Sequence, residues 1–541
     1  MREFQEIAAN EVSEGLPDDD PMLWDREDEE ESSSSSEEDY EPNPRDLRWE
    51  EVDDNWAPNW LMNYNQEQGF SAHYPGGLVD PIDFFQLLFD DEVINLLVLE
   101  TNRYAEQFFT NFPGRLSEKY YQEWQPCTPA RMKAYLGILI HMGLSQLHHM
   151  QSHWENSVHY SCSFCPNVMT RNEFTLLHKF FHIVNNQNAN QDDRLYKIRP
   201  LFNLMVSKFQ RYYVLSKDIT IDERIVKYTG RLIFRQYIRN KPIKLGIKVF
   251  LLSDSLNGYI YNWEVYCGAG QRLDNASLAH EVITRLVEGL HNRGHLVCFD
   301  SYYTNVPTVK YLATRGFGCL GMLRQNRKFI PQVIKRPQEP LEPGEALFRR
   351  SGNLLCFIFK DKKEIRMLTN VYGNAFNGNG KPQALFDYNF LMRGVDKSNQ
   401  SNSYYHFRHK SIKWYKTLFI SVLESTVSNA YQLYKLRFPL TGKKPLMFRE
   451  SLATDLAQEY ITQKHRRLLL SSNLRIIPGL HEISTRNQKN CFICSTNESR
   501  KTTIYYCIEC DKNVCPSRCF YILHTKLHIQ QRNKIVNSQR E

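Results

Sequence analysis

Apolar residues recur at helical spacing in the first part of the chain that carries a clear pattern. Between Pro81 and about Gln210 they return every three to four residues, and Thr128 with Pro129 marks where a second run begins. The two runs are Phe84, Phe85, Leu87, Leu88, Phe89, Val93, Leu96 and Leu97, and then Met132, Tyr135, Leu136, Ile138, Leu139 and Met142. The pattern predicts a helical domain whose core is formed by these side chains.

A pattern typical of strands follows. Residues 219–222 alternate, and 243–252 and 259–266 are rich in β-branched and aromatic residues, with the turn signal Asn257-Gly258 between them. These runs predict three antiparallel strands. A helix at 279–290, a strand at 296–299, a helix at 308–314 and a strand at 319–323 come next. This order predicts an α/β fold with an RNase H-like core.

Proline and helical spacing divide the rest of the chain. Residues 329–380 contain four prolines and two strand-like runs, 354–359 and 365–371, which predict a β-rich insertion. Residues 384–436 keep one apolar helical face until Pro439. The stretch 440–490 has basic clusters and predicts a connector that could serve in nuclear import.

These patterns give a domain organisation that the structure can be compared with. We expect a disordered acidic tail at 1–55, a helical DNA-binding or dimerisation domain at 56–215, the first part of the RNase H-like core at 216–328, the β-rich insertion at 329–383, the rest of the core at 384–440, a basic linker at 441–489 and a cysteine-rich zinc domain at 490–530.

Charge is distributed unevenly along the chain. The first 55 residues hold 22 of the 61 acidic residues and 4 of the 67 basic residues, which leaves 63 basic and 39 acidic residues in the remainder. The acidic segment has too little apolar surface to offset the entropy of ordering, so it is predicted to be disordered. The basic remainder predicts nucleic acid as the partner, with a merely soluble basic surface as the alternative.

The sequence also bears on location. No stretch approaches the ~18 uninterrupted apolar residues of a membrane-spanning helix. The first residues are acidic, whereas a signal peptide begins with positive charge. We therefore expect a nuclear protein with no membrane partner.

The 13 cysteines fall into two groups. Six lie between Cys491 and Cys519, and two histidines follow them, which predicts metal ligation rather than disulfides in a protein without a secretory signal. Seven others are scattered and are expected to be mostly reduced core residues. Among them, Cys162 and Cys165 have metal-like spacing but no second pair, so the sequence alone favours a structural role there.

Three aspartates carry the candidate chemistry. Asp222 lies on a predicted strand among apolar neighbours, where an ionised carboxylate is costly unless it is paired or bound to metal. Asp300 ends a buried strand-like run, and Asp396 lies on the later helical stretch. If the three meet, hard oxygen ligands of this kind suit two Mg²⁺ or Mn²⁺ ions for phosphoryl transfer. Spacing alone leaves a capping or surface role open for each of them.

The motifs around these aspartates stand in the order and spacing of piggyBac-type DNA transposases, including piggyBac transposable element-derived proteins, which the chain resembles from about Pro81 to its C-terminus. The matching segments are Ile219 to Glu223, Gly230-Arg231, Asn240-Lys241-Pro242, Gly246 to Lys248, Phe299 to Thr304, Asp387 to Asn389 and Gly394 to Asp396. The resemblance implies a catalytic triad of Asp222, Asp300 and Asp396 in an RNase H-like fold. It also implies excision and joining of element ends at TTAA targets, and a homodimer on double-stranded DNA with terminal inverted repeats.

One position departs from the family pattern. Where the family usually has Asp-Gln three residues after the last catalytic aspartate, this chain has Asn399-Gln400. Residues three apart share a helix face, so the missing charge could weaken metal binding. A catalytically weakened or inactive, domesticated DNA-binding protein is therefore the alternative to an active transposase.

Basic and aromatic residues flank the proposed site. Their interleaving fits a surface that follows a DNA backbone, although ordinary solvated faces could explain many of them. The candidate DNA-binding residues are Arg231, Arg235, Arg239, Lys241, Lys244, Arg408, Lys410, Lys413 and Trp414.

The C-terminal cluster predicts two tetrahedral Zn²⁺ sites. Its eight candidate ligands are Cys491, Cys494, Cys507, Cys510, Cys515, Cys519, His524 and His528. We expect Cys491 and Cys494 to share one ion with a later pair, but the spacing leaves the partners open. A RING-type ubiquitin ligase is an alternative, but its usual pattern closes on a cysteine pair rather than on histidines. The resemblance to piggyBac-like proteins implies recognition of element ends by this domain.

Overall fold

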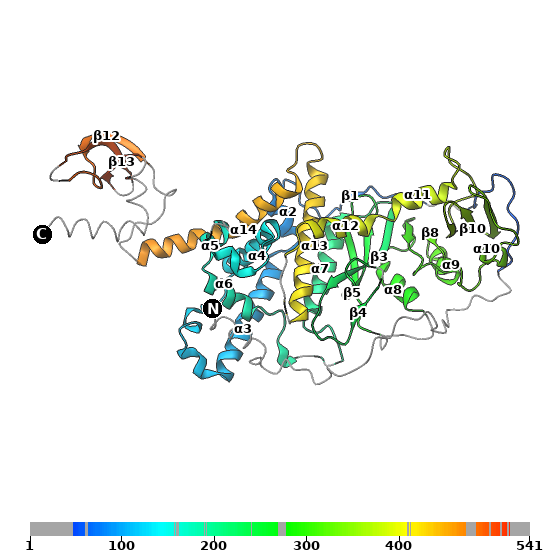
Figure 1. Ribbon diagram of the computed structural model, residues 1–541, viewed down its shortest axis with the longest axis horizontal. Coiled ribbons are helices and arrows are strands. Elements are labelled where there is room, and N and C mark those ends of the chain that lie inside the picture. The colour runs from blue at the N-terminus through cyan, green and yellow to red at the C-terminus, as the bar shows by residue number, and fades with distance from the viewer. Residues whose placement is uncertain are drawn as a thin grey trace. The chain divides into compact units, whose positions relative to one another are not determined.

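The computed structural model describes residues 47–519 except 60–62, 156, 158–161, 189, 191, 240, 269–276, 408–410, 412, 472–482, 497–498, 509–510 and 517–518. The chain separates into two compact units, residues 1–457 and 458–541 (Figure 1). Within the described residues, no helix has the length and apolar character needed to cross a membrane.

Helices dominate the described part of the chain before residue 213, as the apolar spacing predicts. The helices are α2 (Pro81–Leu88), α3 (Asp91–Asn111), α4 (Pro129–Ser145), α5 (Phe164–Val168), α6 (Arg171–Phe180) and α7 (Arg199–Tyr212). Short 3-10 turns η2 (Pro113–Ser117), η3 (Tyr121–Glu123), η4 (Met150–Trp154) and η5 (Asn186–Asn188) connect them. Thr128 caps α4 by accepting from the Arg131 amide, and Pro129 occupies the first turn, where a missing amide hydrogen costs nothing.

A large mixed sheet forms the centre of the first unit. Its strands are β3 (Asp218–Lys227), β4 (Arg235–Tyr237), β5 (Leu245–Asp254), β6 (Ile260–Val265), β7 (Leu296–Phe299), β8 (Gly318–Met322), β9 (Ala346–Ser351), β10 (Leu354–Lys360) and β11 (Glu364–Thr369). The order is β4-β5-β3-β7-β8-β11-β10-β9, and β6 also pairs with β5. A two-stranded sheet of β1 (Gly69–Phe70) and β2 (Tyr213–Val214) lies apart from it.

Pairing directions confirm the predicted meander. β5 is antiparallel to both β3 and β6, whereas β3, β7 and β8 run parallel to one another. Parallel neighbours need crossover connections, and α8 (Leu278–Leu286) and α9 (Val306–Thr314) occupy the links before β7 and β8. The five predicted strands and two predicted helices are all present within a few residues of their expected ends.

Helices cover both faces of the sheet near β3 and β5. Thr220 and Ser253 are register partners on one face, where they approach Gly394 of α12 (Gly394–Tyr404). Asn262, the partner of Leu252, bonds to the Leu286 carbonyl of α8. Adjacent strand residues point to opposite faces, so α12 and α8 lie on opposite sides (Figure 1).

The predicted insertion extends the central sheet instead of standing apart from it. β11 pairs with β8, so the hairpin strands β10 and β9 continue the same sheet outward. β9 carries no strong strand signal, because Arg349 and Arg350 interrupt its apolar residues. α10 (Gln332–Lys335) precedes these strands.

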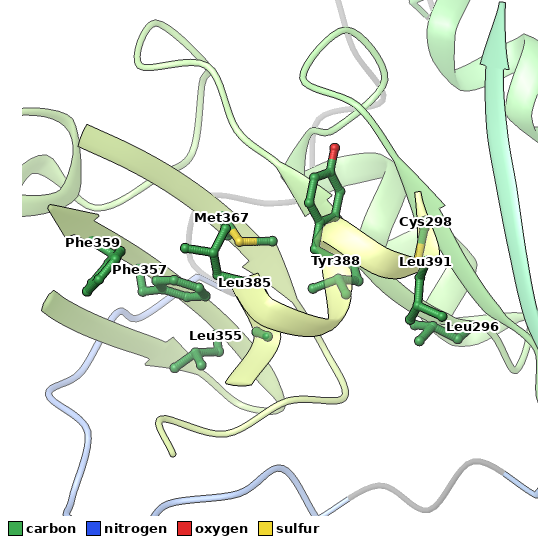
Figure 2. Close-up of a cluster of buried hydrophobic side chains, with 11 residues drawn as sticks. Leu296, Cys298, Leu355, Phe357, Phe359, Met367, Leu385, Tyr388 and Leu391 are labelled. Atoms are coloured by element: carbon green, nitrogen blue, oxygen red, sulfur yellow. The ribbon is translucent and has the colours of Figure 1, made fainter. Parts of the chain in front are cut away.

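Helix α11 (Gln383–Leu391) seals this part of the sheet. Leu385, Tyr388 and Leu391 point from it onto the strands (Figure 2). The buried strand residues of the cluster are Leu296, Cys298, Leu320, Leu355, Phe357, Phe359 and Met367. Burial of an apolar side chain of this size contributes about 1.5–3 kcal/mol, so the cluster fixes α11 and the chain that follows it.

Residues 47–55 fall in the predicted acidic tail, yet they have defined contacts. Glu50 forms a bridge with Arg350 of β9, and Trp49 donates its indole hydrogen to the Phe329 carbonyl. Val52 and Trp56 pack against the core under α11. The prediction of disorder is therefore wrong for 47–55, because these apolar side chains find a surface to cover. Residues 1–46 lie outside the described residues.

The helices after the insertion are longer than predicted. α13 (Trp414–Arg437) is followed by α14 (Pro445–Ser471), which occupies much of the stretch expected to be a linker. The first part of α14 buries Phe448, Leu452, Ala453 and Leu456, a spacing that the many basic and polar residues of the stretch conceal. The second unit contains the antiparallel strands β12 (Ile483–Asn490), β13 (Thr502–Cys507) and β14 (Lys512–Asn513).

Candidate functional site

The sheet register brings two of the three predicted aspartates together. The parallel pairing of β3 with β7 ends where Ile221 meets Phe299. Asp222 and Asp300 are the next residues on the two chains, so they leave the last paired position side by side. β7 stops there because the following residues turn, with the Asp300 side chain accepting from the Tyr302 amide at 2.8 Å.

Helix α12 carries the third aspartate along the same face of β3. Gly394 packs closely on Thr220, and Arg224 donates to Asn399 and Ser398 at 2.6 and 2.8 Å. Thr220, Asp222 and Arg224 share one strand face. The Asp222 side chain therefore points toward α12, between the contacts that Thr220 and Arg224 make with this helix. Asp396 lies in the first turn of α12 and is exposed.

Burial makes the charge of Asp222 unfavourable. Its residue is 9% exposed, and burial, with repulsion from Glu223 and Asp300, raises its carboxyl pKa to about 8. Burial and the charge of Glu223 also raise the pKa of Asp300. Two neighbouring carboxyls that resist ionisation favour a bound cation, because a cation would offset both the burial and the repulsion.

Two side chains beside the aspartates, Glu223 and Tyr303, have no role in the predictions made from the sequence. Burial raises the pKa of Glu223, but Lys248 and Lys241 outweigh it and hold that pKa below its ordinary value. Lys241 lies 2.8 Å from Glu223 and 3.9 Å from Asp222. Tyr303 donates to Glu223 at 2.9 Å. Glu223 follows Asp222 directly in the chain, and this adjacency was the available signal.

Tyr388 of α11 is a third residue near the aspartates that has no role in the predictions made from the sequence. Its hydroxyl is buried and has no hydrogen-bond partner among the described residues. Burial raises its pKa, and the charges of Asp300, Asp222 and Asp396 add to the effect. The negative charges of all three aspartates therefore act on this hydroxyl. Figure 2 shows its oxygen projecting beyond the apolar cluster. A buried donor without a partner next to a set of carboxylates fits a site completed by a metal ion and its ligands.

The three aspartates do not converge on one point in this arrangement. Among the described residues, groups of three or more His, Cys, Asp or Glu ligand atoms within 4.8 Å of one another are formed by cysteine and histidine, not by Asp222, Asp300 and Asp396. Asp222 and Asp300 are adjacent, whereas Asp396 stands on the exposed side of α12. Separate carboxylates of this kind fit a pair of ions better than a single ion.

The position that departs from the family pattern faces an arginine. Asn399 accepts from Arg224 Nε, and Arg224 also donates to Ser425 of α13 at 2.7 Å. Burial lowers the pKa of Arg224 to about 10, although Glu424 opposes the effect. Asn399 thus anchors α12 to β3.

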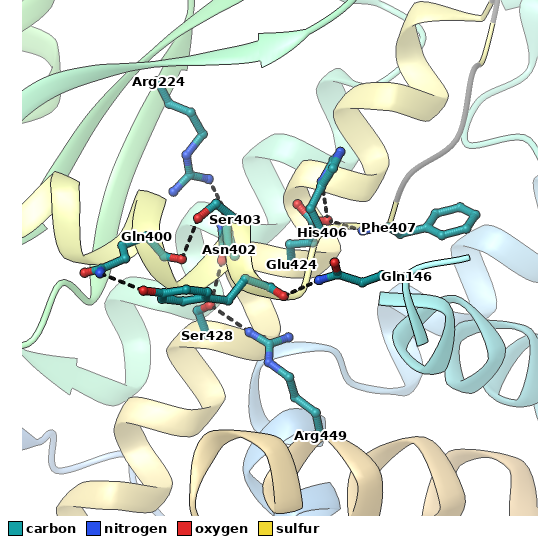
Figure 3. A network of polar contacts seen from close by, with 12 residues as sticks. Gln146, Arg224, Gln400, Asn402, Ser403, His406, Phe407, Glu424, Ser428 and Arg449 are labelled. Carbon is teal, nitrogen blue, oxygen red and sulfur yellow. Dashed lines mark hydrogen bonds and ion pairs between the residues drawn. The ribbon is translucent and has the colours of Figure 1, made fainter. Parts of the chain in front are cut away.

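A polar network holds the C-terminal end of α12 (Figure 3). Glu424 of α13 accepts from His406 at 2.8 Å and from the Phe407 amide at 3.1 Å. Gln146, just after α4, donates to the Tyr404 carbonyl. Arg449 of α14 donates to Ser428 at 3.3 Å. The end of the helix that bears Asp396, and the chain just after it, are therefore held by α13 and by the residue after α4, while α14 bonds to α13.

The predicted DNA-binding residues fall into two neighbouring segments. Arg231, Arg239 and Lys244 are exposed near β4, and Arg235 bonds to the carbonyls of Thr229 and Gly230. The ring of Trp414 packs edge-on against Phe234 at 5.6 Å, which brings the two segments together. Lys413 lies 5.2 Å from the ring centre of Tyr104, and Lys241 faces the acidic pair instead of the open surface. Arg408 and Lys410 lie outside the described residues.

The second unit contains a four-cysteine site. The sulfur atoms of Cys491, Cys494, Cys515 and Cys519 all lie within 4.8 Å of one another, an arrangement that suits tetrahedral Zn²⁺. Burial opposes ionisation of Cys491, but the amides of Cys494, Ile493 and Cys515 bring its pKa down to about 7. These four thiols fit zinc. Cys507 lies between the two pairs in the sequence but does not belong to the group, which is the order expected of interleaved ligation.

The remaining predicted zinc ligands have different outcomes. Cys507 is fully buried at the end of β13, within the apolar cluster of this unit. Cys510, His524 and His528 lie outside the described residues, so a second zinc site stays a prediction.

Comparison with known proteins supplies the family. A family model described as Transposase IS4 matches residues 80–431. The human PiggyBac transposable element-derived protein 2 is 25% identical over 380 residues, covering 66% of this chain and 62% of that protein. The human PiggyBac transposable element-derived protein 3 is 24% identical over 401 residues, covering 68% of this chain and 63% of that protein. The matched part of the chain thus spans less than two thirds of these relatives.

A solved structure agrees in fold. A piggyBac transposase from a synaptic complex with hairpin DNA, determined by cryo-electron microscopy, superposes with a TM-score of 0.68, 22% sequence identity, and coverage of 83% of this chain and 98% of that chain. The resemblance inferred from the sequence motifs is confirmed. The chain belongs to the Transposase IS4 family, and its fold is that of a piggyBac transposase.

Proposed function

We propose that this chain is a cut-and-paste DNA transposase of the piggyBac type that acts in the nucleus. The observation that carries the proposal is the adjacency of Asp222 and Asp300 at the end of the parallel β3–β7 pair, with α12 held over the same strand face. In this proposal strands β6-β5-β3-β7-β8 form an RNase H-like core. A homodimer would hold the inverted repeats of an element and join them to TTAA targets.

Asp222, Asp300 and Asp396 are the proposed ligands for two Mg²⁺ or Mn²⁺ ions. Such ions would activate a water or a DNA 3′-hydroxyl and stabilise the leaving oxygen during in-line displacement at phosphorus. Tyr388 is placed to orient a ligand or a phosphate oxygen, since its hydroxyl has no hydrogen-bond partner in the described part of the chain. Lys241 and Lys248 keep Glu223 ionised, which concentrates negative charge beside the aspartates.

Positive residues around the site would hold the DNA. Arg231, Arg239 and Lys244 expose cations near β4, and Trp414 adds a ring beside them. Phosphate contacts of this kind position a duplex without reading its sequence. The cysteine-rich unit, loaded with zinc, would recognise the terminal repeats.

The proposal is tested with a plasmid that carries the inverted repeats flanking the gene, bordered by TTAA. Purified full-length protein should cut at the repeat ends in the presence of Mg²⁺. Replacement of Asp222, Asp300 or Asp396 by Ala should reduce cutting by about 10³-fold or more, which is the scale expected when charge stabilisation at a reacting phosphate is lost. Asp361→Asn is the matched control, since Asp361 follows β10 and forms a partly exposed ion pair with Lys381. Cutting that survives all three alanine changes would refute the triad.

A second candidate is a domesticated DNA-binding protein without strand transfer. It is favoured by the neutral Asn399, where the family pattern has an acid, and by relatives named as transposable element-derived proteins. The same plasmid separates the two. Repeat binding by parent and alanine variants alike, without cutting by any of them, supports this alternative.

A further inference from the structure

Three ligand-type side chains meet at the end of α4, in the first unit. His141 lies in the last turns of this helix, Cys162 precedes α5, and Cys165 lies on α5. His141 Nε2 is 3.5 Å from Cys162 Sγ, and the ligand atoms of all three residues lie within 4.8 Å of one another. The Cys162–Cys165 pair has the two-residue spacing that zinc sites use, and the histidine supplies the partner that the sequence did not reveal.

The surroundings hold these ligands in place. Cys165 is fully buried, while His141 and Cys162 are partly exposed. The His141 ring stacks on Phe164 at 4.5 Å, which fixes its orientation toward the cysteines. Both thiols are free of disulfides.

We propose that His141, Cys162 and Cys165 bind a Zn²⁺ ion that is independent of the C-terminal cluster. Thiolate and imidazole ligands select zinc over Mg²⁺, which prefers oxygen. Three protein ligands leave a fourth position for water.

The site would stabilise a stretch with little regular structure. Between α4 and α6 the described chain forms only the short η4 and α5, so few backbone hydrogen bonds hold it. A metal ion contributes folding energy directly in such segments. The same end of α4 supports α12, because Gly143 lies against Tyr405 and Gln146 donates to Tyr404. Zinc here would therefore fix the helix that braces the chain after Asp396.

The first test measures zinc per chain in the full-length protein by inductively coupled plasma mass spectrometry. The double change Cys162→Ser and Cys165→Ser should remove one equivalent of zinc. The same loss of one equivalent of zinc is expected in a protein in which Cys491 and Cys494 are also replaced by serine, which separates this site from the C-terminal one. Cys127→Ser is the matched control, since Cys127 is a buried cysteine outside both clusters. Equal zinc content in the parent and the double variant overturns the proposal.

A second measurement avoids mutations that could disturb folding. The parent protein is treated with iodoacetamide before and after zinc is removed with a chelator, and alkylation of the peptide that contains Cys162 is followed by mass spectrometry. Zinc should protect Cys162, so its labelling should accelerate about tenfold or more after chelation. Equal rates before and after, or a Cys162–Cys165 disulfide in the freshly purified protein, show that these thiols hold no metal.

Discussion

At the residue scale, the site places charge where burial opposes it. Asp222 and Asp300 have carboxyl pKa values above the ordinary range because both are buried and both feel Glu223. A sequence optimised for stability alone would not place these groups together. Active sites commonly carry such destabilising groups, and removal of one often raises stability while it abolishes activity.

Asp222→Asn tests this trade-off. The pKa of Asp222 rises from 3.8 to about 8 on folding, so its stabilising protonation is complete at low pH and is lost as pH rises through about 8. In EDTA, the parent Tm should therefore fall progressively between about pH 4 and about pH 8 and level off above that pH. Asp222→Asn should remove that fall and raise Tm by about 2–4 °C for each 1 kcal/mol of relieved strain. Differential scanning fluorimetry across pH measures both effects.

Addition of Mg²⁺ provides the control for this prediction. The ion should raise the parent Tm above pH 8 and leave the Asp222→Asn variant nearly unchanged. Asp361→Asn, on the exposed surface, should behave as the parent does in both buffers. An identical Mg²⁺ response in the parent and in Asp222→Asn would contradict a metal-binding role.

Tyr388→Phe separates stability from function in a second way. The Tyr388 hydroxyl is buried without a described partner, and such a group costs about 1–3 kcal/mol. Its removal should therefore increase the free energy of unfolding in urea by about 1 kcal/mol. If the hydroxyl orients a ligand at the aspartates, DNA cutting should fall about tenfold at the same time. Lower stability of Tyr388→Phe would show that the hydroxyl has a partner in the native protein.

At the element scale, local pattern predicted most of the sheet and long-range contacts explain what it missed. The five core strands were predictable because each contains a short alternating, apolar or β-branched and aromatic run. β9 was missed, because its arginines face partners such as Glu50 and Glu51 that are distant in sequence. α14 was missed for a similar reason, since its few buried residues stand among charged ones.

In the candidate site, too, local motifs were visible in the sequence and long-range contacts were not. The motifs point to Asp222, Asp300 and Asp396 as candidates, but sheet register is what sets the first two side by side. The anchoring of Asn399 by Arg224 joins residues 175 positions apart, and no local pattern contains that information. The His141 contact with Cys162 likewise depends on how a helix and a loop pack.

Asn399→Asp tests how α12 is fixed to β3. A carboxylate in place of the amide would pair with the buried Arg224, and a hydrogen bond to a charged group contributes about 1.5–3 kcal/mol. We expect a higher Tm and an unchanged Mg²⁺ concentration for half-maximal cutting, because the side chain faces the arginine. Titration of Mg²⁺ in the plasmid assay checks the second point. A tenfold lower Mg²⁺ requirement would place residue 399 at the metal instead.

Gly143→Ala tests the contact between α4 and the end of α12. An added Cβ would lie 2.2 Å from the Tyr405 carbonyl oxygen, so the two elements would have to move apart. Overpacking of this kind costs about 1–3 kcal/mol, measured as a loss in the free energy of unfolding. Gly114→Ala is the matched control, because among the described residues no atom beyond its chain neighbours lies within 4 Å of the added Cβ. Equal free energies of unfolding for Gly143→Ala and Gly114→Ala would show that α4 and the end of α12 can move apart without a loss of stability.

At the scale of the whole molecule, the candidate catalytic site and the four-cysteine site lie in separate units. Residues 1–457 contain the sheet, the aspartates and the helices that brace them, whereas the four-cysteine site lies in 458–541. The second unit has a small core of Cys491, Cys507, Val514 and Cys519. Because this described core is small, it offsets little of the entropy of folding, which supports metal ligation as a source of stability for this unit.

Chelation should therefore act on the two units differently. In the double variant Cys162→Ser and Cys165→Ser, where the first unit has no proposed zinc ligands, a zinc chelator should unfold the second unit and leave the main thermal transition within about 2 °C. Binding to the repeat DNA should weaken by about tenfold or more, because only the second unit loses its structure. Limited proteolysis should then cut after α14 while the fragment ending near Ser471 persists. A main transition that falls in parallel with zinc loss would show that the large unit depends on the small one, and that the two do not fold independently.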